Sequence, residues 1–288
     1  MRIFALMALL CTWGLATGGK GLAPPEKSLP FSLMDLDVKV HPLDCQGPGE
    51  IRVFVFLSTE CPIANGNIPT LNQLHRELGR TGTAKLFGVV SDPFTTRGEA
   101  ARHYRDYQTR FPILFDSSRQ LCEQFQPSHV PEAFVVDATG RLAYRGAIDN
   151  AWEAVGKRRQ VVTSHYLAEA LERLRTNQSP NPARTQPVGC PVEYPPLDSP
   201  ERVVTYHRDI APVLLFRCAE CHREKGTAFD LSGLEQAKLQ GKRIATTPCK
   251  GPTAATRQCT PFEKSLLQVW LDRGMPPGDT ADSPGKAR

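Results

Sequence analysis

The clearest chemical pattern in the chain is a C-x-x-C-H motif formed by Cys218, Cys221 and His222. This spacing is the attachment signature of c-type haem, in which both cysteines form thioethers with the porphyrin and the histidine binds the iron. A zinc site would need a second Cys or His pair at similar spacing, whereas Cys249 and Cys259 are ten residues apart. The motif therefore predicts one covalently bound haem c with His222 as an iron ligand.

A second ligand of the haem iron is expected near the end of the same segment. Met275 precedes two prolines there, and a thioether is a soft ligand that raises the potential of haem iron. Leu266, Val269 and Trp270 supply an apolar helix face just before it, which could pack against a haem or form an ordinary core. We predict that Met275 is the second ligand, the alternative being an exposed methionine in a Pro-rich tail.

Cys61 is the second candidate for chemistry, because it lies between a predicted buried strand at Ile51–Leu57 and a predicted helix. Backbone N–H groups and the helix dipole favour a thiolate at a helix N-terminus. The Val130-Pro131 pair precedes a later strand and is a candidate cis bond beside the same junction. Cys61 is therefore predicted to be a reactive thiol, the alternative being an inert or disulfide-bonded cysteine.

The elements that must position Cys61 alternate between strands and helices over residues 28–176. Pro69 should kink the first helix, and the Asp137 to Gly140 turn should connect a terminal hairpin. This alternation predicts an α/β layer fold with parallel pairing. The strands are expected at 51–57, 84–90, 111–115, 134–136 and 142–144, and the helices at 61–78, 97–107 and 161–174.

The rest of the chain divides by composition. Residues 177–202 are rich in Pro, Asn and Ser and are predicted to be a linker; 203–279 read as a small helical haem unit and 280–288 as a flexible tail. Residues 1–19 combine Arg2 with an apolar run that is too short to span a bilayer, which predicts a signal peptide and a periplasmic or otherwise exported protein. Cys11 would leave with that peptide, and no later segment is apolar enough for a stable membrane span.

Composition excludes several classes of function. The chain has 288 residues, of which 40% are hydrophobic and 23% charged, the balance of a soluble globular protein. A net charge of +5 is too small and diffuse for a nucleic-acid binder. From residue 203 onward there are 13 Lys and Arg against 9 Asp and Glu, which could aid docking to an acidic redox partner protein or simply be a solvated surface.

Residues 203–279 resemble the cytochrome c family. The resemblance rests on the run Tyr206–Leu214 before the C-x-x-C-H motif and on the Met-Pro-Pro sequence after it. It implies a small, mostly α domain with one haem. The chain departs from the family at 249–259, where an extra loop is expected and where Cys249 and Cys259 could form a stabilising disulfide.

The first domain resembles the thioredoxin-like superfamily, in its peroxiredoxin-like (alkyl hydroperoxide reductase/thiol-specific antioxidant) branch. The resemblance rests on the strand before Cys61, Val130-Pro131, the Gly140 turn and the sequence 144–149. It implies a central mixed sheet flanked by helices. Ala64 replaces the second cysteine of a C-x-x-C motif, so dithiol exchange within one motif is excluded, and Phe54 stands where peroxiredoxins have a proline.

The same resemblance implies a partner thiol for Cys61. Cys190, which follows the closing helix of the domain, is the preferred resolving cysteine; Cys122 comes second and Cys45 is a further alternative. Thiolate attack on a peroxide or a disulfide would then give a mixed or internal disulfide. Arg145 could stabilise the thiolate, although a solvated charge on the hairpin is the simpler interpretation.

Together these features predict an exported redox protein that couples thiol or peroxide chemistry to electron transfer through a c-type haem. As an enzyme it would be a thiol oxidoreductase or a peroxidase acting on peroxide or protein disulfides. The alternatives are a non-catalytic electron-transfer and partner-binding module, and a short relative of fusions between a redoxin, a cytochrome and a copper monooxygenase.

Overall fold

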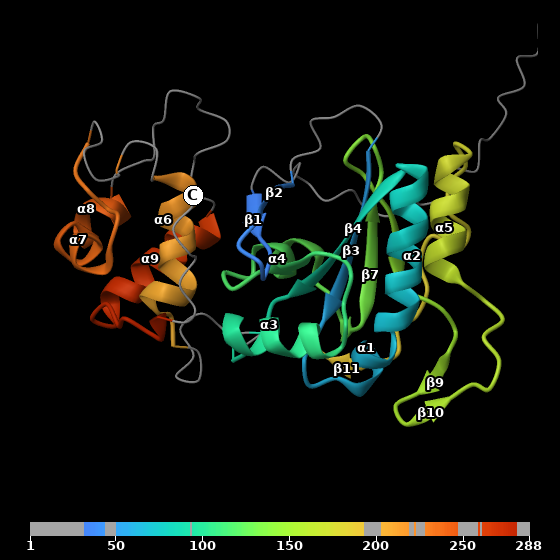
Figure 1. Cartoon of the computed structure of the whole chain (residues 1–288). Helices are drawn as coiled ribbons and strands as arrows, with labels where there is room; N and C mark the ends of the chain where they lie inside the picture. Colours follow the sequence, from blue (N-terminus) through green and yellow to red (C-terminus); the bar gives the residue numbers. More distant parts are fainter. Residues whose placement is uncertain are drawn as a thin grey trace, which may run out of the picture.

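The computed structural model describes residues 32–43, 50–92, 94–192, 203–218, 222, 228–246, 259 and 261–280. They form two units with separate hydrophobic cores, a first unit (32–192) and a second unit (203–280), which lie side by side in Figure 1. The expected signal peptide, Cys45, Cys221 and Cys249 fall outside the described residues. Among the helices that are described, none is long and apolar enough to cross a membrane.

A five-stranded mixed sheet forms the centre of the first unit, in the order β5-β4-β3-β7-β8. Strand β3 pairs in parallel with β4 and antiparallel with β7. Every residue of β3 is buried, which explains why its sequence is a continuous apolar and aromatic run without alternation. The mixed α/β fold expected from the sequence is confirmed. The strands are β3 (Ile51–Leu57), β4 (Ala84–Val90), β5 (Ile113–Phe115), β7 (Glu132–Val136) and β8 (Leu142–Gly146).

Helices cover both faces of this sheet, with α2 and α5 together on one side and α3 and α4 toward the other (Figure 1). The helix expected to kink at Pro69 is two helices that meet at Asn67. Pro69 lies in the first turn of the second, where its missing N–H has no intrahelical partner to lose. The helices are α1 (Pro62–Gly66), α2 (Ile68–Thr81), α3 (Arg97–Asp106), α4 (Gln120–Phe125) and α5 (Tyr166–Arg175).

Part of the expected linker belongs to the first unit. Arg145 donates its N–H to Ala183 O and accepts at its own carbonyl from Thr185 N–H. Further along, β11 (Cys190–Pro191) pairs antiparallel with β6 (His129–Val130). The Pro-rich composition is typical of a linker, yet these backbone hydrogen bonds hold residues 183–192 against the sheet. Two further hairpins join β1 (Ser32–Met34) to β2 (Val40–Pro42) and β9 (Trp152–Ala154) to β10 (Lys157–Arg158).

The second unit is mostly helical, as the sequence predicts. Its core centres on Trp270, which is fully buried and whose Nε1–H donates to Pro276 O at 3.0 Å. Tyr206 N–H donates to the same carbonyl, so the chain after the last helix returns to the first helix. The helices are a π-helical turn η1 (Tyr206–Ile210), α6 (Ala211–Arg217), α7 (Leu234–Leu239), α8 (Gly241–Thr246) and α9 (Pro261–Asp272).

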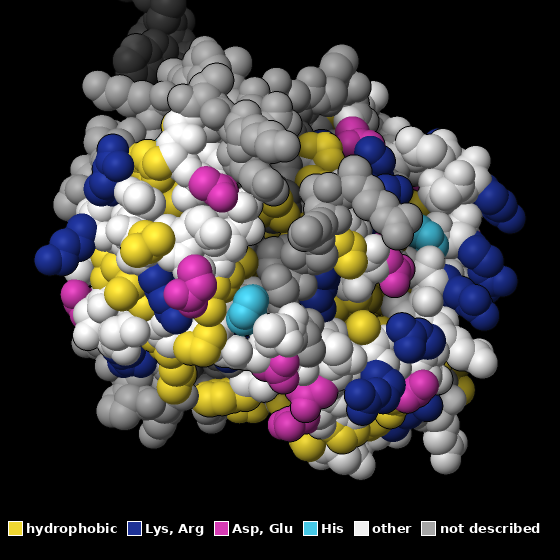
Figure 2. Space-filling view, turned by 60° about the vertical axis from the view of Figure 1, so that its left-hand side comes forward, with side chains coloured by type: hydrophobic (Ala, Val, Ile, Leu, Met, Phe, Trp, Pro, Cys, Tyr) yellow, Lys and Arg dark blue, Asp and Glu magenta, His cyan; other side chains and the backbone are white. Residues whose placement is uncertain are grey.

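Charged side chains on the face shown in Figure 2 are mixed in sign. Lys and Arg lie among acidic, polar and hydrophobic groups and do not form one continuous basic patch on that face. This distribution agrees with the small net charge of the chain.

Candidate active site

A pocket of about 560 Å³ opens where the carboxyl ends of β3 and β4 meet α4 and the β6–β11 pair. Cys61 is the N-cap residue of α1 and lies on this pocket, at the strand-to-helix junction where the sequence places it. Cys122 of α4 and Cys190 of β11 line the same pocket. The other lining residues are Phe56, Leu57, Ser58, Glu60, Ser91, Asp92, Phe94, Pro127, Val130, Pro191 and Val192.

The structure brings Cys61 and Cys190 together. Cys61 Sγ lies 3.0 Å from the carbonyl oxygen of Val130. Val130 is the residue directly opposite Cys190 in the β6–β11 register. Burial, the hydrogen bond to Cys61 and the charge of Cys61 together raise the pKa of Cys190 to about 11. Cys190 therefore stays a thiol at neutral pH.

The loop before β7 and the segment before β11 approach each other closely. The Val130–Pro131 peptide bond is cis. A Cβ atom added to Gly189 would lie 2.0 Å from Val130 O and 3.1 Å from Pro131 Cδ. Only glycine allows this approach, so Gly189 determines how near Cys190 comes to Cys61.

Replacing Gly189 with alanine is expected to push β11 away from β6. The clash is with backbone, so we expect a loss of about 1–3 kcal/mol in the free energy of unfolding and slower formation of a Cys61–Cys190 disulfide. Urea unfolding and thiol trapping over time would measure both. Gly79→Ala is the matched control, since an added Cβ there meets nothing within 4 Å and lies in α2. Equal behaviour of the two variants would contradict this prediction.

Cys122 lies on a different wall of the pocket from the Cys61–Cys190 pair. Its sulfur is 3.5 Å from Arg119 Nη2, and its backbone N–H donates to Asp116 Oδ2 at 3.0 Å. The Cys122 side chain is almost fully buried, at 1% exposure. Cys190 lies opposite Val130, whose carbonyl accepts the Cys61 thiol, and it therefore remains the preferred partner.

Asp116 is a buried acid beneath the pocket that sequence analysis missed. It follows β5, is fully buried and accepts a hydrogen bond from Ser91 Oγ at 2.8 Å. Burial raises the pKa of Asp116 to about 6, against hydrogen bonds that favour its charged form. Because the sequence neighbours of Asp116 carry no sign of this environment, only the fold reveals it.

The raised pKa of Asp116 predicts a pH-dependent stability. The ordinary pKa of an Asp carboxyl is 3.8, so the folded protein binds the proton of Asp116 more tightly than the unfolded chain does. The stabilisation that this proton gives is complete below pH 3.8 and is lost as pH rises through about 6. The loss amounts to about 3 kcal/mol in the free energy of unfolding. Denaturant unfolding of wild type and Asp116→Asn between pH 4 and 7.5 should show this slope in the wild type alone.

Asp35→Asn is the control of opposite sign. Burial raises the pKa of Asp35, but hydrogen bonds from His41 and from backbone N–H groups outweigh it and lower the pKa overall. Its stabilising effect is present above its ordinary pKa and is lost as pH falls. A wild-type slope that persists in Asp116→Asn would contradict the assignment.

Arg145 is engaged away from Cys61. Its Nη2 lies 2.7 Å from Oε1 of the buried Glu132, and its guanidinium lies over the Phe134 ring at 4.8 Å from the centroid. The simpler interpretation of Arg145 as a hairpin charge was therefore incomplete, because it pairs with a buried carboxylate. The recorded contacts give it no part in holding a thiolate at Cys61.

The ring of His222 of the C-x-x-C-H motif is held by Phe229. Its Nδ1 lies 2.8 Å from Phe229 O, and the rings of His222 and Phe229 meet edge to face with their centroids 4.3 Å apart. Donation from Nδ1 fixes the tautomer in which Nε2 is free to bind a metal. Cys218 caps α6, and its carbonyl accepts the His222 N–H at 3.0 Å. Cys218 and His222 thus lie close together, as two residues that hold one haem would need to.

Met275 lies just after α9, the last helix of the second unit. Its backbone is left-handed, with φ of 61°, and its N–H donates to Trp270 O. A Cβ added to Gly241 of α8 would lie 3.2 Å from Met275 Sδ. The contacts recorded for Met275 within the described residues are with α8 and α9 and do not join it to His222, so its role as second ligand stays a prediction.

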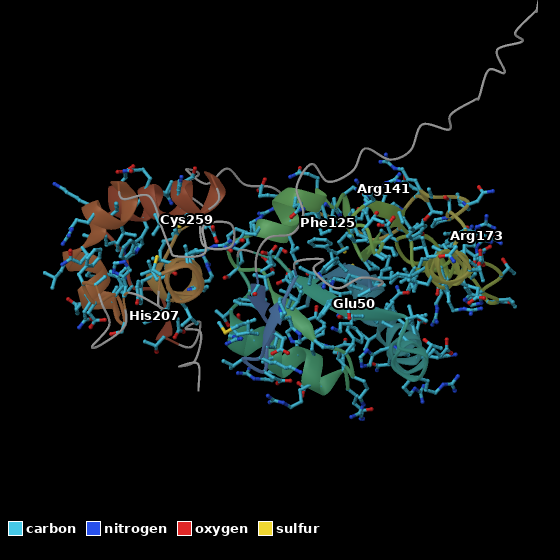
Figure 3. All side chains as sticks on the ribbon, turned by 90° about the horizontal axis from the view of Figure 1, so that it is seen from above. Glu50, Phe125, Arg141, Arg173, His207 and Cys259 are labelled. Atoms are coloured by element: carbon cyan, nitrogen blue, oxygen red, sulfur yellow. The ribbon has the colours of Figure 1, made fainter. Side chains whose placement is uncertain are left out.

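The two units touch through a polar contact next to the pocket helix. Gln120 Nε2 of α4 donates to Glu263 Oε1 of α9 at 3.0 Å. Glu263 is buried and pairs with Arg217 at 3.0 Å, the residue before Cys218. Cys259 is buried in the same core and is labelled in Figure 3. The helix that carries Cys122 is thus hydrogen-bonded to Glu263 of α9, which in turn pairs with Arg217, the residue before the C-x-x-C-H motif.

Solved structures share the fold of the first unit. A hypothetical protein from Sinorhizobium meliloti has a TM-score of 0.53 at 18% identity, over 61% of this chain and 97% of that one. An uncharacterized conserved protein from Geobacillus kaustophilus has a TM-score of 0.51 at 19% identity, over 62% and 95%. With its central mixed sheet and flanking helices, the first unit has a thioredoxin-like fold.

Sequence comparison refines this class. Residues 25–145 match the model of the AhpC/TSA family. Protein FixW of Rhizobium leguminosarum is 27% identical over 145 residues, which cover 43% of this chain and 65% of that protein. The chain therefore spans just under two thirds of this relative, and the family match ends before the second unit begins.

Proposed function

We propose that this protein is an exported thiol–disulfide redox protein in which Cys61 and Cys190 form the reactive pair. The observation that carries the proposal is that Cys61 and Cys190 line one pocket, with Cys190 paired to Val130, whose carbonyl accepts the Cys61 thiol. The sequences and folds similar to the first unit support a redox role, and the export signal expected at residues 1–19 supports the compartment.

The exchange needs only the two thiols and a partner disulfide. The Cys61 thiolate attacks one sulfur of that disulfide, forming a mixed disulfide and releasing the other sulfur as a thiolate that takes up a proton. Cys190 then loses its proton and attacks the Cys61 sulfur, which breaks the mixed disulfide. The partner gains two electrons and the protein keeps a Cys61–Cys190 disulfide. The same steps in reverse oxidise a partner dithiol.

The second unit is proposed to carry one haem c. Cys218 and Cys221 would hold it as thioethers, His222 would bind the iron and Met275 is the proposed second ligand. When bound, the haem supplies one-electron transfer to a redox partner protein. The Arg217–Glu263 pair and its contact with Gln120 fix the segment before the motif against α4.

Disulfide mapping of the oxidised full-length protein tests the thiol assignment. We expect a peptide that contains Cys61 linked to Cys190, and we expect the Cys122→Ser variant to form the same link. Peroxide and a peptide disulfide should be compared as oxidants, because the pocket could admit either. Cys61 paired with any other cysteine, or Cys61 left unpaired by both oxidants, would rule out the proposed pair.

A further inference from the structure

Asn65 of α1 holds the chain on both sides of Glu60. Its side-chain Nδ2 donates to Thr59 O at 3.0 Å, and its backbone N–H donates to Cys61 O at 3.0 Å. Asn65 is 9% exposed, so a side-chain amide that lost its partner would be left buried and unsatisfied. The residues before and after Glu60 are therefore both fixed to α1 through Asn65.

The oxygen of the same amide faces α3. Asn65 Oδ1 lies 2.9 Å from Nε2 of His103. The Thr59 carbonyl only accepts, which orients the amide with Nδ2 toward it, and the amide oxygen also only accepts, so His103 Nε2 carries the hydrogen. Burial lowers the pKa of His103 more than the charge of Asp106 raises it. The ring is therefore neutral at neutral pH, with its proton on Nε2.

The His103 ring is itself held by two aromatic neighbours. It stacks on Tyr107 with the ring centroids 4.6 Å apart, and it meets Tyr104 edge to face at 5.0 Å. Helices α1 and α3 lie side by side in Figure 1, and the bond between His103 and Asn65 joins them. This bond ties the Asn65 amide, and with it the turn that carries Cys61, to a second element of the fold.

The turn before Cys61 depends on such contacts. Residues 58–61 lie between β3 and α1, outside both elements, and α1 has only five residues and little rigidity of its own. Cys61 Sγ nevertheless lies 3.0 Å from the carbonyl of Val130, the residue opposite Cys190. A displacement of about 1 Å between reacting groups is enough to slow a reaction strongly.

We propose that Asn65 and His103 are positioning residues that keep the Cys61 sulfur within reach of Cys190. This inference rests on the proposed function of the two cysteines. The step it serves is the attack of Cys190 on the mixed disulfide. A Cys61–Cys190 bond forms and the bond from Cys61 to the partner sulfur breaks; that sulfur leaves with the electron pair and takes up a proton in place of the one that Cys190 lost. Neither positioning residue gains or loses an atom or an electron.

A matched pair of variants at His103 tests the proposal. His103→Gln keeps a side-chain N–H that can donate to Asn65 Oδ1, whereas His103→Leu keeps similar bulk without a donor. The reduced full-length protein is mixed with one equivalent of a peptide disulfide, and the mixed disulfide on Cys61 is followed by acid quenching and mass spectrometry. We expect its conversion to the Cys61–Cys190 disulfide to slow about tenfold in His103→Leu and in Asn65→Ala. His103→Gln should convert at close to the wild-type rate.

Asn72→Ala separates positioning from stability. Asn72 of α2 donates through Nδ2 to Gln108 O at 3.1 Å and accepts from Arg110 N–H at 2.7 Å, so its amide also bridges two elements, but it bonds the loop after α3. This variant should lower the urea midpoint of unfolding and leave the conversion rate unchanged. Equal conversion rates in His103→Leu and His103→Gln, or a slowing in Asn72→Ala as large as that in Asn65→Ala, would overturn the proposal.

Failure of the proposed function would look different from failure of this inference. A wild type whose mixed disulfide on Cys61 never converts to the Cys61–Cys190 disulfide would overturn the proposed pair, and this inference with it. A wild type that converts no faster than His103→Leu and Asn65→Ala would overturn this inference alone.

Discussion

Replacing Cys61 with serine is expected to lower the rate of disulfide exchange by at least about 10³-fold. A serine hydroxyl is not ionised at neutral pH and is a poor nucleophile toward a disulfide, so the first bond-forming step is lost. The measurement is turnover of a fluorescent peptide disulfide by the reduced full-length protein. Serine is close in size to cysteine, so the buried site should tolerate the change and the fold should remain intact.

Cys190→Ser provides the matched control. This variant keeps the nucleophile but lacks the thiol that lies against it, so it should attack the substrate once and accumulate a mixed disulfide on Cys61. Gel electrophoresis under non-reducing conditions would show that adduct. Substantial exchange by Cys61→Ser, or no adduct on Cys61 in Cys190→Ser, would contradict the assignment of the two roles.

Changing both Cys218 and Cys221 to alanine is expected to remove all covalently bound haem. The protein should be produced with a c-type haem maturation system, and the reduced spectrum of the denatured protein measured. The wild type should show the band of a thioether-linked haem, and the double variant should show none because no thiol remains to add to the vinyl groups. A wild type without that band would contradict haem attachment itself.

Met275→Ala separates attachment from iron ligation. Attachment depends on the cysteines, so this variant should keep its covalent haem, while loss of a thioether ligand should lower the reduction potential. A potential equal to that of the wild type would exclude Met275 as a ligand. That result would agree with the packing of its side chain against Gly241.

Local patterns predict the sheet well, because β3 is buried on both faces and its sequence records this directly. The break at Asn67 is harder to predict. A proline in a helical stretch predicts a kink but does not indicate the residue at which the helix begins again. Composition predicts a linker over 177–202, and it misses the hydrogen bonds of residues 183–192 to the first unit for a non-local reason. The order of these residues depends on backbone partners at Arg145 and Val130, far away in sequence.

The candidate site divides in the same way. Cys61 could be located from a strand followed by a helix, and the choice of Cys190 came from a family resemblance. The environments of Asp116 and Asn65 could not be predicted, because both depend on which groups surround them in the folded protein. Glu263 gave no sequence signal for its ion pair either, since Arg217 lies 46 residues earlier.

Strand β11 also sets where the second unit is tethered. Val192 N–H donates to Ser128 O immediately after Cys190–Pro191, and the ten residues 193–202 then lead to the second unit, a reach of at most about 35 Å. The connection to the second unit begins at the strand that holds Cys190, so a Cys61–Cys190 disulfide would fix its start covalently at the pocket. The first unit, which contacts the second through Gln120 and Glu263, would then be held more firmly at its end in the oxidised protein.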